Sequence, residues 1–163
     1  MDEFTITDDK KKRALSAGSD LPDSDDQLFE ISQFPLLDVD EGIANLGSLP
    51  VLKELLTMLL EDELPADEAN LKQFFEASNW EGIERLAHKM KSGALYCGTV
   101  RMQMACQYLE RYRKASQSLL LEKLYHQLMS VIDDTKKAIK NYGLIGGTNS
   151  TSSESGVFFS NIE

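Results

Sequence analysis

A histidine, two lysines and a serine lie close together near the middle of this chain: His88, Lys89, Lys91 and Ser92. A neutral imidazole is a competent nucleophile at the pH of the cell, because its pKa lies nearby. Lysine side chains can neutralise the oxygens of a carboxylate or of a phosphoryl group. These residue types therefore permit group transfer onto His88, provided that one face of an element presents them together to solvent.

Helical spacing predicts such a face. Winding residues 80–97 at 100° per residue gathers an apolar core stripe within about 100° of arc. The stripe consists of Ile83, Leu86, Ala87, Met90, Ala94 and Cys97. His88 lies about 150° from the centre of this stripe and is expected to point into water. Its neighbours on the exposed face are Glu84, Arg85, Lys91, Ser92 and, one turn further on, Leu95.

The charge around this helix differs in sign from that of the chain. The whole sequence has a net charge of −10, whereas residues 81–115 contain seven basic and three acidic groups. The basic groups are Arg85, Lys89, Lys91, Arg101, Arg111, Arg113 and Lys114. A positive patch on an acidic protein suits docking against an acidic pocket or a phosphoryl group. The acidic balance of the whole chain argues against a general binder of nucleic acid or anionic membranes.

Each of these residues also has a more ordinary interpretation. A lone exposed histidine on an amphipathic helix is usually a solvated polar residue, and His126, which has no comparable neighbours, is expected to be structural. A metal site is disfavoured because Cys97 and Cys106 lack chelating spacing with His88. Apart from Glu84, no carboxylate is expected beside His88. The two cysteines are expected to be reduced core thiols.

Length and composition indicate one helical domain with tails. The chain has 163 residues, of which 42% are hydrophobic and 27% charged. No apolar run is long enough for a transmembrane helix, and residues 2 and 3 are acidic rather than part of a secretory signal. We therefore expect a cytoplasmic protein with no membrane insertion and no nucleic acid partner. The oligomeric state is left open.

Changes in composition along the chain predict three parts. Residues 1–35, with nine acidic and four basic side chains, are expected to form a flexible acidic tail or linker. Residues 36–142 are expected to form the helical domain, and residues 143–163, rich in Gly, Ser and Thr, a flexible C-terminal tail.

Within the domain, helices are expected over residues 40–46, from residue 50 onward, and over residues 67–77, 80–97, 100–115 and 118–142. Asn79 is expected to cap the fourth of these, Gly98 and Thr99 to make the next corner, and Pro65 to break or re-aim the chain. Short connections favour antiparallel neighbours. The fold class predicted is therefore all-α, an antiparallel four-helix bundle with additional short N-terminal helices.

Around the string Ala87-His88-Lys89-Met90-Lys91-Ser92-Gly93-Ala94, the sequence resembles the histidine-containing phosphotransfer (HPt) family. The family pattern places Lys three positions after the His, Gly four after, small residues next and Gly ten after. The matching residues here are His88, Lys91, Ser92, Gly93 with Ala94, and Gly98. Ser92 departs from the pattern, because the family has glycine at this position. That glycine leaves room beside the imidazole for the active site of the partner. Leu37-Asp38-Val39-Asp40-Glu41-Gly42 and Asn79-Trp80-Glu81 are similar to segments of the family, and Gly98-Thr99-Val100-Arg101-Met102 is most similar to HPt modules of tripartite hybrid sensor kinases.

The resemblance implies a phosphohistidine carrier. His88 would accept a phosphoryl group from an aspartyl phosphate on one receiver domain and donate it to another, with Lys91 and Lys89 stabilising its charge. Arg85, Ser92, Leu95 and Glu84 would contribute to binding. No intrinsic cofactor is expected, and magnesium would come with the receiver. The sequence has no glycine-rich phosphate loop, so no kinase ATP-binding domain is expected, and the resemblance implies a phosphocarrier protein rather than a free-standing enzyme.

A non-catalytic helical adaptor is the alternative. Such a protein would keep the bundle and bind a receiver domain, while Ser92 blocks transfer. The presence of His88 and Lys91 favours the relay, whereas Ser92 keeps the adaptor as an alternative hypothesis.

Overall fold

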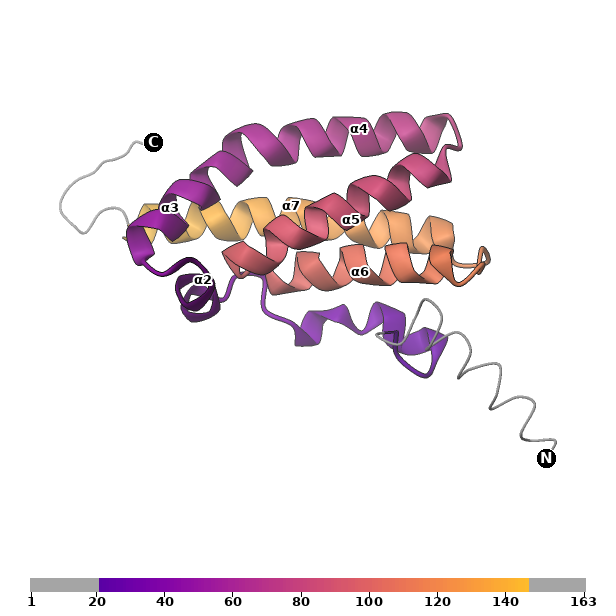
Figure 1. The fold of residues 1–163 in the computed structure, drawn as a ribbon, viewed down its shortest axis with the longest axis horizontal. Helices are drawn as coiled ribbons and strands as arrows, with labels where there is room; N and C mark the ends of the chain where they lie inside the picture. The colour runs from indigo at the N-terminus through magenta and orange to yellow at the C-terminus, as the bar shows by residue number, and fades with distance from the viewer. Residues whose placement is uncertain (1–20, 147–163) are drawn as a thin grey trace.

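The computed structural model describes residues 21–146, and this part of the chain is all-helical, as predicted (Figure 1). Its helices are η2 (Asp25–Phe29), η3 (Ile31–Gln33), α2 (Val39–Leu46), α3 (Leu49–Met58), the π-helical η4 (Leu59–Glu63), α4 (Leu64–Glu76), α5 (Trp80–Cys97), α6 (Val100–Lys114) and α7 (Leu121–Gly146). Helix α5 packs against α4 and α6, α6 packs against α7, and α4 contacts α7. The core therefore lies among these four long helices.

The helix α3 continues through η4 into α4, although Pro65 stands in its path. Proline has no N–H to donate and its ring clashes with the carbonyl one turn earlier. The wider π turn absorbs this clash, and the N–H of Leu64 donates to the carbonyl of Leu59, five residues back. Pro65 thus occupies the first turn of α4, and the predicted break is a local widening of the helix.

The two ends of α5 follow from its capping residues. The side chain of Asn79 accepts a hydrogen bond of 2.9 Å from the N–H of Gly82, as predicted for an N-cap. Gly98 ends the helix with a φ of 76°, and a Cβ there would collide with the carbonyl of Asp38. Thr99 forms the corner with Gly98, as predicted, and stands at the N-cap of α6, but its hydroxyl donates back to the carbonyl of Ala94 and does not cap α6. These caps fix the register of α5.

The N-terminal tail predicted for residues 1–35 requires a correction. Residues 1–20 lie outside the described part of the chain, but residues 21–35 pack against the bundle. Leu28 is only 1% exposed, and its carbonyl accepts a hydrogen bond from the side chain of Gln127. The Arg101 guanidinium donates to the carbonyls of Phe34 and Ser32. An acidic composition did not prevent ordering, because a few apolar side chains of this segment are buried and its carbonyls have donors on α6 and α7.

The last helix also differs from its predicted bounds, since α7 begins at Leu121 rather than residue 118 and extends to Gly146 rather than residue 142. The remainder of the predicted C-terminal tail, residues 147–163, lies outside the described residues. Within residues 21–146, no single helix is long and apolar enough to cross a membrane. The pair Val39–Leu46 and Leu49–Glu76, bent by 105°, meets the length and composition criteria only when taken together.

Candidate functional site

Helix α5 places His88 as its sequence predicts. The residues of the predicted core stripe are buried, except that Leu86 is only half-buried. His88 lies on the opposite side, with 61% of its side chain exposed. Ser92 and Leu95 are exposed as well, and Leu95 retains 40% exposure.

The imidazole of His88 is held by a carboxylate from the neighbouring helix. Its Nδ1 lies 2.8 Å from Oε2 of Glu110 on α6, a residue whose side chain is fully buried. The other oxygen of Glu110, Oε1, accepts a hydrogen bond of 2.9 Å from Nζ of Lys91. One buried carboxylate thus connects the histidine and the lysine three residues after it.

Opposing effects act on the pKa of Glu110. Burial alone raises this pKa, but hydrogen bonds from Lys91 and His88, and the positive charge of these residues, outweigh burial and lower it below its ordinary value. The carboxylate is therefore ionised and acts only as an acceptor. A neutral His88 must then carry its proton on Nδ1, an assignment that follows from the hydrogen-bond network. The lone pair is on Nε2, on the far side of the ring from Glu110.

Lys91 differs from its predicted position on the solvent face. Only 16% of its side chain is exposed, because its Nζ contacts the buried carboxylate of Glu110. Its charge is thus held by the buried carboxylate. Lys89 is the more exposed lysine, at 69%, and its Nζ lies 3.4 Å from Oδ1 of Asp67 on α4.

Glu84 and Arg85 have partners other than His88. The two oxygens of Glu84 bind Arg113 at 2.5 Å and Lys114 at 2.9 Å, both near the end of α6. Arg85 is paired with Glu81 on its own helix. The expectation that Glu84 is the carboxylate beside His88 is therefore wrong, since Glu110 has that place.

Sequence reasoning missed Glu110, although a signal for it exists. On α6, Glu110 follows the buried Cys106 by four residues and Leu109 by one, so helical spacing places it toward the core. A buried carboxylate requires a hydrogen-bonding or charged partner. An acid at a core position of α6 could therefore have been matched with the basic face of α5.

Residues 54–139, from α3 into α7, match the Hpt domain family, and this span includes His88, Lys91 and Glu110. The chain belongs to the HPt family. Neither the curated proteins nor the solved structures compared with the chain yield a match. HPt domains carry a phosphoryl group on a histidine in two-component phosphorelays and interact with receiver domains.

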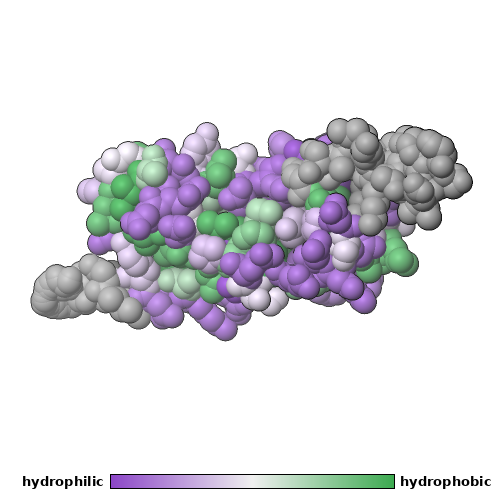
Figure 2. All heavy atoms as spheres, turned by 90° about the horizontal axis from the view of Figure 1, so that it is seen from below, coloured by the Kyte–Doolittle hydropathy of each residue, from purple (hydrophilic) through white to green (hydrophobic). Residues whose placement is uncertain are grey.

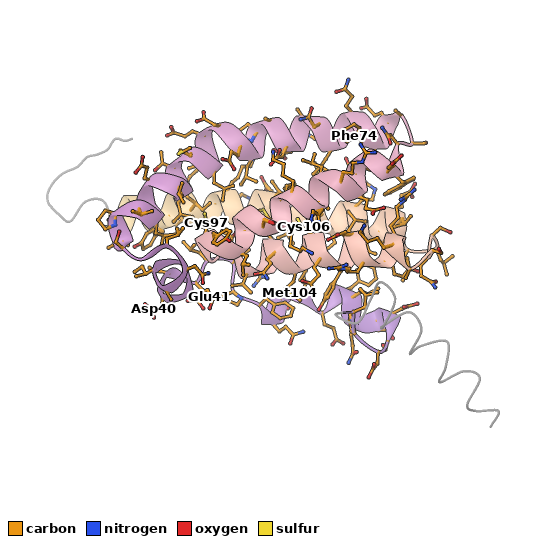
Figure 3. All side chains as sticks on the ribbon, in the orientation of Figure 1. Asp40, Glu41, Phe74, Cys97, Met104 and Cys106 are labelled. Carbon is orange, nitrogen blue, oxygen red and sulfur yellow. The ribbon has the colours of Figure 1, made fainter. Side chains whose placement is uncertain are left out.

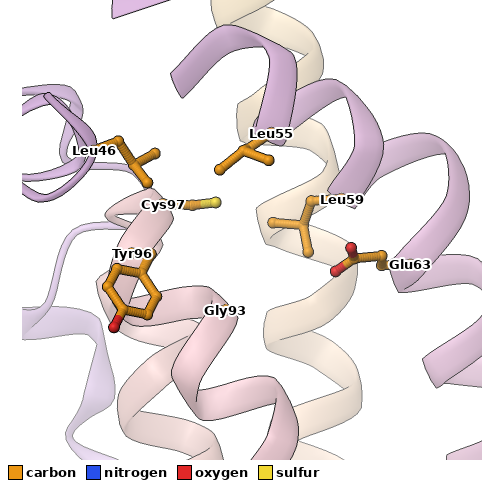
Figure 4. A pocket seen from close by; sticks show the side chains of 7 residues that line it. All are labelled: Leu46, Leu55, Leu59, Glu63, Gly93, Tyr96 and Cys97. Carbon is orange, nitrogen blue, oxygen red and sulfur yellow. The ribbon is translucent and has the colours of Figure 1, made fainter. Parts of the chain in front are cut away.

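An apolar groove of about 340 Å³ lies beside α5 in this HPt domain. It is lined by Leu46, Leu55, Leu59, Glu63, Gly93, Tyr96 and Cys97 (Figure 4). Tyr96 is 54% exposed at its edge, and the amide of Asn45 holds α2 to α5 through the carbonyl of Leu95. On the face seen from below, apolar residues gather toward the end of the molecule where α2 and α3 lie (Figure 2).

The cysteines of this HPt domain are both buried free thiols, as predicted. They lie at different levels along the bundle (Figure 3). Burial, followed by the negative charge of Glu63, raises the pKa of Cys97. Burial also raises the pKa of Cys106, with smaller contributions from Asp67 and Glu110. Among residues 21–146, no group of three His, Cys, Asp or Glu side chains is arranged to hold a metal ion.

Proposed function

We propose that this HPt domain is the histidine phosphotransfer intermediate of a multistep phosphorelay and that His88 is its phosphorylated residue. The observation that carries the proposal is the contact between Nδ1 of His88 and the ionised Glu110, which leaves the lone pair of the exposed ring on Nε2. An attacking nitrogen must meet the active site of a second protein, and Nε2 lies on the outward side of the ring.

In the transfer step, the Nε2 lone pair attacks the phosphorus of an aspartyl phosphate on a receiver domain. A P–N bond forms while the P–O bond to the aspartyl carboxylate breaks, and the carboxylate leaves with the electron pair. The Nδ1 proton stays in its hydrogen bond with Glu110, so the positive charge that develops on the ring faces an anion. Transfer to a second receiver reverses these steps, and the P–N electron pair returns to Nε2.

The neighbouring residues have distinct roles in this proposal. Lys91 acts mainly through Glu110, which it keeps ionised and in place, while its charge adds to the positive field at the ring. Lys89, exposed and weakly held by Asp67, is available to pair with a phosphoryl oxygen. Arg85 and Ser92 lie at the rim of the site, where they would meet the partner.

The partner would dock on the exposed end of α5 and the adjoining groove. Leu95 and Tyr96 are exposed there, and Leu46, Leu55 and Leu59 line the groove. Burying such apolar side chains favours association. Magnesium belongs to the receiver in this proposal, and the HPt domain needs no cofactor of its own.

We also propose the arrangement of the bundle, its cellular compartment and the kind of relay in which it acts. Helices α4, α5, α6 and α7 would form the antiparallel four-helix bundle of the functional unit, with α2 and α3 added at one end. The relay would operate in the cytoplasm. The similarity of residues 98–102 to HPt modules of tripartite hybrid sensor kinases suggests relays of that kind as its context.

The test is phosphoryl transfer from phosphorylated receiver domains of the source organism, followed by intact mass. We expect the wild type to gain one acid-labile phosphoryl group and the His88→Gln variant to gain none. Retention of the gain in His88→Gln would refute the assignment of His88.

A receiver-binding adaptor is the second candidate, favoured by the exposed Ser92 at the position where the family has glycine. Binding of receivers without transfer by the wild type would support it. A Ser92→Gly variant that then acquires transfer would identify the serine as the block.

A further inference from the structure

Two cations beside the proposed phosphorylation site are held together by a single carboxylate. Arg113 binds one oxygen of Glu84 at 2.5 Å, and Lys114 binds the other at 2.9 Å. Glu84 has 14% of its side chain exposed, whereas Arg113 and Lys114 retain 35% and 41%. The carboxylate is enclosed while the two cations reach toward solvent.

This group lies one helical turn from His88 along both helices that bear it. Glu84 precedes His88 by four residues on α5, so the two share a face. Arg113 and Lys114 follow Glu110 by three and four residues on α6. Because His88 and Glu110 are in contact, the separation along the helices is about 5 to 6 Å, which long Arg and Lys side chains can span.

The two lysines nearest His88 in the sequence are both paired with carboxylates, Lys89 with Asp67 and Lys91 with Glu110, so a phosphoryl group gains from further cations. Lys91 is the lysine that the family pattern places three residues after the histidine, but only 16% of its side chain is exposed. Its Nζ contacts one oxygen of the buried Glu110 carboxylate, and His88 contacts the other. A phosphoryl group on Nε2 would add about two negative charges on the outer side of the ring. A phosphate dianion competes strongly with one carboxylate for arginine and lysine.

We propose, on the basis of the function proposed above, that Arg113 and Lys114 bind the phosphoryl group on His88 and that Glu84 holds both cations while His88 is unmodified. Phosphorylation transfers one or both cations from Glu84 to the phosphoryl oxygens. Glu84 thereby competes with the phosphoryl group for the two cations. The stronger its ion pairs with Arg113 and Lys114, the shorter the lifetime of the phosphohistidine.

The proposal predicts effects on the lifetime of the phosphohistidine. In the loose transition state of phosphoryl transfer, the phosphoryl dianion becomes metaphosphate-like as the P–N bond breaks, so the net negative charge on its oxygens falls. Cations on those oxygens therefore stabilise the phosphohistidine more than the transition state, and they slow spontaneous loss. Removing a cation should shorten the lifetime, and removing the competing carboxylate should lengthen it.

The experiment charges the full chain with phosphoramidate, a small donor that needs no receiver. The Nε2 lone pair forms a P–N bond with the phosphorus while the P–N bond to ammonia breaks, and ammonia leaves. After removal of the donor, intact mass follows the loss of the phosphoryl group over time. We compare Arg113→Gln, Lys114→Gln and Glu84→Gln, with Lys140→Gln as the control for loss of one exposed positive charge.

The proposal predicts that the half-life of the phosphohistidine changes in opposite directions in the cation variants and in the carboxylate variant. We expect Arg113→Gln and Lys114→Gln each to shorten the half-life by about three-fold or more, and Glu84→Gln to lengthen it by about two-fold. Arg113→Gln and Lys114→Gln each lose one ion pair with Glu84, and Glu84→Gln loses both, so a merely structural role would move every half-life in the same direction. Equal shifts in one direction, or half-lives equal to that of Lys140→Gln, would overturn the proposal.

Failure of the underlying function gives a different result. If the wild type and His88→Gln gain the same phosphoryl mass, His88 is not the acceptor and the proposed function falls together with this inference. If His88 alone is charged and the three variants decay like the wild type, only the inference falls. Thermal unfolding of the uncharged variants checks that each retains the fold.

Discussion

His88 and Glu110 are 22 residues apart in the chain, yet Nδ1 of the histidine lies 2.8 Å from a carboxylate oxygen of the glutamate. The contact joins an exposed ring to a fully buried anion. It therefore sets both the orientation of the ring and the nitrogen that carries the proton.

Glu110→Gln tests this relationship directly. The amide keeps the size of the side chain but loses the negative charge, so the hydrogen bond to Nδ1 is no longer charge-assisted. Such a bond contributes about 1.5–3 kcal/mol, and we expect phosphoryl transfer to slow by about tenfold or more. Nitrogen NMR of the His88 ring should show a mixture of both tautomers, whereas the wild type should show the Nδ1–H form. An unchanged tautomer would remove Glu110 from the positioning of His88.

The lowered pKa of Glu110 gives the stability a defined pH dependence. A carboxylate with a lowered pKa in the folded state stabilises the protein above its ordinary pKa of about 4.3, and this contribution is lost as pH falls through the folded value. The unfolding free energy of the wild type should therefore exceed that of Glu110→Gln at pH 7, and the difference should shrink in acid. Chemical denaturation from pH 7 to pH 3 measures it. Glu61→Gln, at an exposed position, serves as the control.

Lys91→Ala should destabilise the fold, contrary to what an exposed lysine would predict. The change leaves the buried Glu110 with one partner fewer, at a cost of about 1–3 kcal/mol. Urea denaturation measures the loss. The double variant Lys91→Met with Glu110→Gln, which removes both charges, should recover much of it. Full stability of Lys91→Ala would show that solvent, rather than Lys91, compensates the carboxylate.

Met90→Asp should prevent folding, because Met90 is 5% exposed on the core face of α5 and an unpaired charge there is costly. Circular dichroism should show loss of helix and of the cooperative thermal transition. A stably folded variant would contradict the burial of this face.

Leu95→Asp should leave the fold intact, since Leu95 lies on the outer face of the same helix with 40% exposure. Transfer from a phosphorylated receiver should fall because the apolar contact of the proposed docking surface is lost. Charging of His88 by phosphoramidate should be unchanged, because that donor needs no docking. Equal rates with the receiver would place docking elsewhere on the molecule.

The sequence by itself determined the local features of this protein. The apolar stripe of α5, the exposure of His88 and the caps at Asn79 and Gly98 were all predictable, because each depends on residues within a few positions of one another. The resemblance to the HPt family rested on the same short segment. Helical periodicity relates neighbours along one helix, and this explains why the core stripe, the exposure of His88 and the caps agreed with the structure, while the partners of Lys91 and Glu84, which lie on α6, did not follow from it.

Only the tertiary structure decided which side chains meet across helices. Glu110 on α6 reaches His88 and Lys91 on α5, and Glu84 holds cations of α6. Helical spacing indicates that Glu110 faces the core, but it does not specify which side chains of α5 it meets. The packing of residues 21–35 likewise depends on side-chain N–H groups of Arg101 and Gln127, about 70 to 100 residues away, that donate to carbonyls of this segment. Such pairings are set by the rotation and register of packed helices, which the periodicity of a single helix does not contain.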